Sequence, residues 1–245
     1  MHFRFRPAVW FGLALAACAS PVPAQRIRDT NANSWWVYAG DHPVKGPWGV
    51  YAEIQVRRSD FAAIEQQFQS RDAITYRFSP SAQVAVGYVY THTAQYGDFP
   101  VARAFKEHRT YQQLAIKQNL KQLEIEHRYR NEQRWIQNYT GGGNDFFWRY
   151  QNRARYQLKA SLSIKGPWYI FGGDEILVPY GPNHGLSAFD QNRAFAGIGY
   201  KVTPQNKLEV GYMNQFLIQR NGRIEESNHT LRVQFSSTVP LLRKR

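Results

Sequence analysis

A regular alternation of apolar and charged side chains constrains the fold of this chain more than any other feature of its sequence. Between Leu123 and Ile136, one face carries Leu123, Ile125, His127, Tyr129 and Trp135, and the other carries Glu124, Glu126, Arg128, Arg130, Glu132 and Arg134. A repeat of two residues places successive side chains on opposite faces of a β-strand. The segment from Phe146 to Leu162 repeats the pattern, and its charged face includes Arg149, Arg153, Arg155 and Lys159. Strands so long and so two-faced predict a sheet with lipid on one side and a polar interior on the other.

The same alternation recurs in ten segments from Trp48 to Thr238, and the links between them differ in length. Short links alternate with longer ones, as the periplasmic turns and external loops of outer-membrane barrels do. Tryptophans stand near the ends of several segments, where barrel strands meet lipid headgroups. The short links are residues 79–81, 119–121, 165–167 and 203–206, the long links are 93–106, 137–145, 180–191 and 219–228, and the tryptophans are Trp48, Trp135, Trp148 and Trp168.

These patterns predict an all-β protein, a closed antiparallel up-and-down transmembrane β-barrel formed by residues 48–238. We expect ten strands, with twelve as the alternative. An even number of strands, with the short turns in the periplasm, places both ends of the barrel in the periplasm. Residues 25–47, which include Trp35 and Trp36, are then a periplasmic N-terminal segment or an extra strand, and residues 239–245 are a basic C-terminal tail.

The first 24 residues have the organisation of an export signal. Arg4 and Arg6 precede an apolar stretch from Ala8 to Ala17, and small residues then lead to a cleavage site after Ala24. Acylation of Cys18 after lipoprotein processing is the alternative. No other stretch approaches the roughly 18 consecutive apolar residues that a membrane helix requires. We therefore expect export to the outer membrane of a Gram-negative bacterium, with the membrane crossed by strands.

The chain is strongly basic, with a formal net charge of +13. This charge favours acidic partners, and export makes nucleic acid an unsuitable one. The expected partners are outer-membrane lipids and lipopolysaccharide, the barrel-insertion machinery and small anionic solutes.

The charged faces must line the lumen, because an Arg or Lys facing lipid at the bilayer midplane costs about 2 to 4 kcal/mol. Two interpretations of this lining remain open. In the first, its surplus of cations attracts anions that pass through the barrel. In the second, its ion pairs fill the interior, as side chains often do in small barrels. The residues expected to contact anions are Arg128, Arg130, Arg134, Arg149, Arg153, Arg155 and Lys159, with Glu124, Glu126 and Glu132 as their ion-pair partners.

Two further functions are alternatives to a structural or transport role. An outer-membrane enzyme acting on lipid or cell-envelope fragments would use His184 and Asp190, with Asp174 and Glu175 on the preceding strand. No common catalytic or metal-binding motif supports this function, so we expect no catalytic residues, no metal and no cofactor. An adhesive or lipopolysaccharide-contacting surface would use the long link at residues 180–191.

Several segments resemble the family known as domain of unknown function 2490, across roughly residues 30 to 238. They are Ser34 to Tyr38, Glu107 to Leu114, Glu126 to Arg134, and Gly173 to Glu175. The resemblance implies an outer-membrane barrel of about this size, and it implies no substrate or catalytic residue. Outer-membrane barrels usually end on an aromatic residue, and this chain departs from that pattern. Phe235 is followed by ten residues, Ser236 to Arg245, which include Pro240 and the basic Arg243-Lys244-Arg245.

Overall fold

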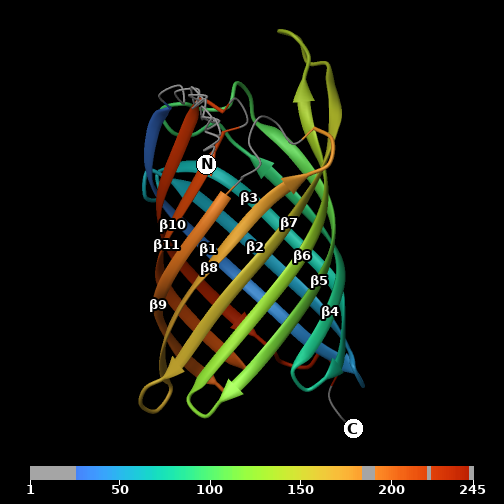
Figure 1. Cartoon of the computed structure of the whole chain (residues 1–245), viewed down its shortest axis with the longest axis vertical. Helices are drawn as coiled ribbons and strands as arrows, with labels where there is room; N and C mark the ends of the chain where they lie inside the picture. The colour runs from blue at the N-terminus through green and yellow to red at the C-terminus, as the bar shows by residue number, and fades with distance from the viewer. Residues whose placement is uncertain (1–25, 184–190, 220–221, 243–245) are drawn as a thin grey trace, which may run out of the picture.

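Eleven strands close into one barrel in the computed structural model of the chain, which describes residues 26–183, 191–219 and 222–242 (Figure 1). The predicted export signal, Cys18 and the last three residues of the basic tail lie outside these ranges. Within them, no helix is long and apolar enough to cross a membrane. The strands are β1 (Ile27–Lys45), β2 (Trp48–Ser59), β3 (Ile64–Ser79), β4 (Ala82–Thr93), β5 (Phe105–Leu120), β6 (Leu123–Tyr139), β7 (Phe146–Ser163), β8 (Trp168–Tyr180), β9 (Gln191–Thr203), β10 (Asn206–Ile218) and β11 (Ile224–Ser237).

The prediction of ten strands is wrong, because residues 27–45 form the additional strand β1. This strand pairs with β2 in antiparallel orientation and with β11 in parallel orientation, and so it closes the barrel. Every other neighbouring pair is antiparallel and consecutive in the sequence. Consecutive strands alternate in direction, so an odd number of strands requires one parallel pair at the closure. The fold is all-β and closed, as predicted, but it is not antiparallel throughout.

The odd strand number also separates the two ends of the barrel sheet. We call the side with the short links the turn end and the side with the longer links the loop end. β1 reaches the turn end at Lys45, so it begins at the loop end, whereas β11 finishes at the turn end (Figure 1). The expectation that both ends of the sheet share one side depended on an even strand count, and the structure differs for that reason.

Local backbone chemistry explains the tight turns. Gly46 and Gly166 occupy two of the short links with φ values of 56° and 58°, in the left-handed region that glycine adopts at little steric cost. The longer links lie at the other end, between β2 and β3, β4 and β5, β6 and β7, β8 and β9, and β10 and β11.

The strands tilt strongly around the barrel, as their register shows. A walk through directly paired residues leaves β1 at Pro43, passes through every strand in turn, and returns to β1 at Asp29. This stagger brings side chains from distant parts of the sequence to the same height inside the barrel.

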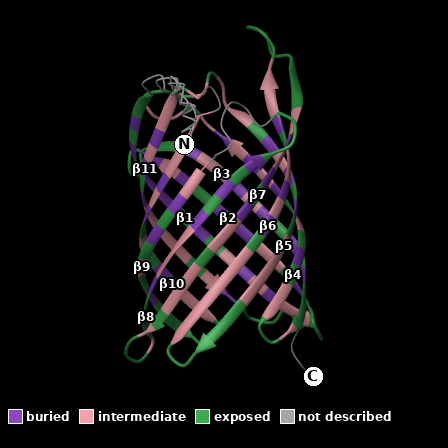
Figure 2. Ribbon diagram, in the orientation of Figure 1, coloured by how far each residue is buried: buried purple, intermediate pink, exposed green. Residues whose placement is uncertain are grey.

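Burial alternates along the strands and separates the two faces of the sheet (Figure 2). The most buried side chains are largely polar or charged, whereas most large apolar side chains on the strands are exposed. This is the reverse of a water-soluble barrel and agrees with the predicted polar interior and apolar exterior.

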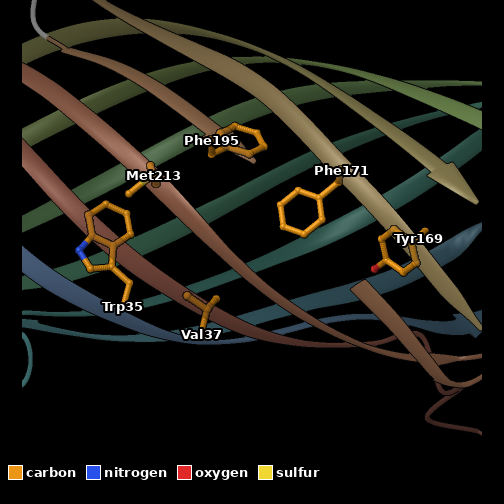
Figure 3. Close-up of a cluster of buried hydrophobic side chains, with 6 residues drawn as sticks. All are labelled: Trp35, Val37, Tyr169, Phe171, Phe195 and Met213. Atoms are coloured by element: carbon orange, nitrogen blue, oxygen red, sulfur yellow. The ribbon is translucent and has the colours of Figure 1, made fainter. Parts of the chain in front are cut away.

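The larger of two clusters of buried apolar side chains among the described residues lies inside the barrel (Figure 3). It consists of Trp35, Val37, Tyr169, Phe171, Phe195 and Met213, contributed by β1, β8, β9 and β10. Glycines provide the room for its rings: a Cβ added to Gly199 would lie 2.1 Å from Cζ of Tyr169, and one added to Gly197 would lie 2.7 Å from Cζ of Phe171. The aromatic rings therefore pack directly on the backbone of the neighbouring strand.

Candidate functional site

The outer face of the barrel carries exposed aromatic side chains near both ends. Trp48 packs edge-on against Tyr76 at the turn end, with ring centroids 4.8 Å apart. Trp168 lies near the same end, and Trp135 and Trp148 lie towards the loop end. All four tryptophans are exposed. Two aromatic bands of this kind are typical of barrel strands that meet lipid headgroups on both sides of a membrane.

Inside the barrel, Glu132 on β6 is the centre of an ion-pair group. Its carboxylate oxygens lie 2.6 Å from Nη2 of Arg153 and 2.7 Å from Nη1 of Arg155, and Nη1 of Arg130 is 3.9 Å away. Arg153 lies directly opposite Glu132 in the register of β6 and β7, so the ion pair joins these two strands. The side chain of Glu132 has no exposed surface, which makes it the most enclosed carboxylate of the lumen.

A second group surrounds Glu175 on β8. Its oxygens accept hydrogen bonds from Arg155 Nη2 at 2.6 Å, Arg193 Nη1 at 3.1 Å and Arg128 Nη2 at 3.2 Å. These arginines come from β7, β9 and β6, so one carboxylate joins four neighbouring strands. Arg155 belongs to both groups and links Glu132 to Glu175.

Further ion pairs extend this network along the lumen. Arg109 and Arg134 share Glu107, Arg71 pairs with Glu53, Lys159 pairs with Glu209, and Lys117 pairs with Glu126. All but the Arg71–Glu53 pair involve β5, β6 or β7. The wall from β5 to β9 is therefore a ladder of paired charges.

Most of the predicted lumen residues lie along this ladder, but Glu124 forms no ion pair with a described residue, and Glu132 is enclosed by its arginines and lines neither of the two lumen cavities. Arg128, Arg134, Arg153 and Arg155 line a cavity nearer the loop end, and Arg128, Arg130, Lys159, Glu124 and Glu126 line one nearer the turn end. Arg149 lines neither cavity. It lies opposite Ile136 near the loop end of β7, and its Nη1 donates a hydrogen bond to the backbone carbonyl of Asn183 at 3.0 Å.

The two cavities divide the interior of the barrel. The loop-end cavity has a volume of about 430 Å³, and the turn-end cavity has a volume of about 240 Å³. Both linings include Glu53, Arg128, Gln157 and Arg232, which come from β2, β6, β7 and β11. These four side chains mark the boundary between the cavities.

The two cavities differ in charge. Nine arginines and four glutamates line the loop-end cavity, whereas six basic and five acidic side chains line the turn-end cavity. The surplus of positive charge is therefore concentrated at the loop end, and a solute arriving there meets the basic cavity first.

Three lumen cations form no ion pair with any carboxylate of the described residues: Arg57, Arg232 and Lys207. Arg57 and Arg232 bond to glutamine oxygens instead, Arg57 to Gln55 and Gln67, and Arg232 to Gln234. Arg57 lines the loop-end cavity, Arg232 lines both cavities and Lys207 lines the turn-end cavity. They stand on β2, β11 and β10, so together they mark a route along the wall that faces the ladder.

Residues 94–104, which connect β4 to β5, cover part of the loop-end cavity. Tyr96 and Val101 line the cavity, and the hydroxyl of Tyr96 donates a hydrogen bond to Glu226 on β11 at 3.3 Å. Gln219 Nε2 donates to the carbonyl of Phe99 at 3.2 Å. Burial and the Glu226 carboxylate raise the pKa of Tyr96 above its ordinary value. The connection thus reaches across the mouth of the barrel to β11.

Sequence reasoning identified the ladder on β6 and β7 but missed the three unpaired cations. Each of them lies on a strand whose alternation was recognised, but the residues that surround it come from distant segments. A count of inward-facing charges strand by strand would have found them, but their lack of a carboxylate partner depends on the closed register.

The residues considered for an acid–base site do not assemble into one in the described part of the chain. Asp174 and Glu175 are consecutive strand residues and so point to opposite faces. Asp174 accepts hydrogen bonds from Nδ2 of Asn192 at 2.8 and 2.9 Å, and Glu175 is held by three arginines. His184 and Asp190 lie outside the described residues. Among the residues described, no group of three or more His, Cys, Asp or Glu side chains could hold a metal ion.

A closed barrel with an apolar exterior, a charged lumen and internal cavities defines a porin-like β-barrel protein. The chain belongs to the family described as Protein of unknown function (DUF2490), which matches residues 32–228. The family membership expected from the Trp-rich segment and the two charged strands is therefore confirmed.

Two further proteins are similar to this chain. An uncharacterised protein of Methylorubrum extorquens is 24% identical over 206 residues, which are 83% of this chain and 85% of that protein. The structure of the NanC porin is similar with a TM-score of 0.49 and 12% sequence identity, over 80% of this chain and 92% of that one.

Proposed function

We propose that this protein is an outer-membrane channel that passes small anionic solutes. The observation that carries the proposal is the line of three lumen cations without carboxylate partners, Arg57, Arg232 and Lys207, which runs from the loop-end cavity to the turn-end cavity. A cation paired with a carboxylate attracts a passing anion less than an unpaired cation does, because the carboxylate offsets part of its charge. An unpaired cation in a narrow, low-dielectric lumen attracts anions and repels cations.

The ladder on the other wall has a different role in this proposal. Its cations are paired with carboxylates, in places two or three to one carboxylate, and these contacts hold β5 to β9 together, as the filled-barrel interpretation requires. The two interpretations of the charged interior therefore apply to different walls. The predicted residues Arg128, Arg130, Arg134, Arg153, Arg155 and Lys159 contribute chiefly to the ladder, and the anion route lies opposite them.

The proposed location follows from the outer face. An apolar exterior with aromatic side chains near both ends suits a bilayer, and the lipids and lipopolysaccharide of the outer membrane are the proposed surroundings. This location implies export, with cleavage after Ala24 or lipoprotein processing at Cys18, followed by assembly through the barrel-insertion machinery.

The proposal is tested with the mature full-length chain in planar lipid bilayers under a potassium chloride gradient. We expect a reversal potential of the sign that marks chloride as the more permeant ion. Replacing the three route cations together, Arg57→Gln, Arg232→Gln and Lys207→Gln, should move the reversal potential towards zero or to the opposite sign.

A matched control removes three positive charges that line neither cavity, Arg26→Gln, Arg58→Gln and Lys165→Gln, and should leave the reversal potential unchanged. A cation-selective wild-type channel would refute the proposal, and so would an equal effect of the two triple variants.

A filled barrel with a structural role is the second candidate, and the covering of the loop-end cavity by residues 94–104 favours it. The bilayer experiment separates the two functions. The absence of any conductance, in wild type and in a variant with residues 96–101 replaced by a short Gly-Ser linker, would support the filled barrel.

A further inference from the structure

The side chain of Arg57 is buried in the loop-end cavity with part of its hydrogen-bonding capacity unused. It is 8% exposed. Nε and Nη2 donate to Oε1 of Gln55 at 3.1 and 2.6 Å, and Nη1 donates to Oε1 of Gln67 at 2.6 Å. A guanidinium carries five N–H donors, so two remain after these three bonds. Neutral amide oxygens fix the orientation of the group and leave its charge uncompensated.

A second guanidinium lies against the same aromatic ring. Cζ of Arg57 is 3.7 Å and Cζ of Arg193 is 5.3 Å from the ring centroid of Trp35, whose indole N–H donates to Gln66 at 3.2 Å. Arg193 is 9% exposed, and its Nε is buried without a hydrogen-bond partner. Arg57 has no carboxylate partner, whereas Arg193 pairs with Glu175 and keeps one unused donor. Two buried guanidiniums with unused donors, both close to one tryptophan ring, form a site suited to an oxyanion.

An apolar wall borders these cations. Phe195 and Met213 line the same cavity, and both belong to the apolar cluster that contains Trp35 (Figure 3). Arg193 and Phe195 are two residues apart on β9 and therefore face the lumen together. An apolar wall beside the cations does not stabilise a hydrated inorganic anion, whereas it can contact the apolar part of an organic one.

From these neighbours we infer that the loop-end cavity binds a small organic carboxylate. Its carboxylate accepts hydrogen bonds from Arg57 and Arg193, and its apolar body lies against Phe195 and Met213. The cavity of about 430 Å³ falls within the usual range for small-molecule sites. The inference rests on the proposed function, since it names the class of anion that the channel holds on its way through.

Binding of sodium benzoate and sodium acetate to the purified full chain in detergent, measured by isothermal titration calorimetry at low ionic strength, tests the inference. We expect benzoate to bind more tightly than acetate. Arg57→Gln should weaken benzoate binding by about tenfold or more, as the loss of charge-assisted hydrogen bonds implies. Arg58→Gln is the matched control, because Arg58 is the next residue on β2 and bonds to the carbonyls of Ala62 and Ala63.

Two more variants separate the charge from the apolar wall. Met213→Gln should weaken benzoate by roughly threefold to tenfold through the loss of apolar contact, and leave acetate unchanged. Arg57→Lys keeps the charge and the anion selectivity of the channel but loses the planar donor group, so it should also weaken benzoate. Heat-modifiable electrophoretic mobility verifies that each variant forms the barrel.

The outcomes distinguish this inference from the proposed function. An anion-selective channel in which benzoate does not bind, binds no better than acetate, or is insensitive to Arg57→Gln would overturn the carboxylate site alone. A cation-selective channel would overturn the proposed function, whatever the calorimetry shows.

Discussion

Replacing Glu132 by glutamine should destabilise the barrel by an amount that follows from the ion pairs described above. Glu132 has no exposed surface and holds Arg153 and Arg155 through direct hydrogen bonds at 2.6 and 2.7 Å. The substitution keeps the size of the side chain and removes its charge. It leaves two guanidiniums facing one neutral carbonyl and an amide group that cannot accept.

The expected loss is about 3 kcal/mol in the free energy of unfolding. Each charge-assisted hydrogen bond contributes roughly 1.5 to 3 kcal/mol, and the glutamine carbonyl retains part of one of them. Breaking a buried ion pair on one side generally costs about 3 to 5 kcal/mol, because the other charge stays buried. Arg155 keeps its bond to Glu175, which places the estimate at the low end of that range.

Urea unfolding of the barrel in lipid vesicles, followed by tryptophan fluorescence, measures this change. Glu225→Gln serves as the comparison, because Glu225 pairs with Arg26, whose side chain is 40% exposed, and exposed pairs contribute about 0 to 1 kcal/mol. If Glu132→Gln and Glu225→Gln both shift stability by less than about 1 kcal/mol, the ladder does not hold the wall together and the reasoning fails.

Two other changes test the covering of the mouth and the packing of the apolar cluster. Replacing residues 96–101 by a short Gly-Ser linker should raise the single-channel conductance, because Tyr96 and Val101 then no longer cover the loop-end cavity; an unchanged conductance would mean that the connection does not obstruct the path. Gly197→Ala should cost about 1 to 3 kcal/mol in urea unfolding, since its Cβ would lie 2.4 Å from the carbonyl oxygen of Val210. Gly142→Ala, with nothing within 4 Å of the added Cβ, should stay within about 0.5 kcal/mol, and equal losses in both variants would contradict the packing argument.

The sequence predicted the strands from β2 onward because each of them has apolar residues on its lipid-facing side. The first part of β1 lacks that signal. Thr30, Ala32 and Ser34 alternate with Asp29, Asn31 and Asn33, so both faces are polar or small near the loop end. Its pairing with β11 joins residues about 200 positions apart, and no local pattern specifies a contact of that range. The periodicity therefore predicted a barrel, whereas the number of strands depends on the pairing of β1 with β11, which the periodicity does not specify.

The same distinction applies to the site. Glu132 and Arg153 were found because they lie on consecutive strands joined by a hairpin, where the register follows from the turn. Whether Arg57 has a carboxylate partner depends on its neighbours across β1 and β11 and on the opposite wall, which only the closed barrel brings to its height. Counting charges in the sequence does not separate paired cations from unpaired ones, and the proposed anion route depends on the unpaired ones. The sequence placed the candidate anion contacts on the wall of the ladder, whereas the route that we propose lies on the opposite wall, where the cations have no carboxylate partner.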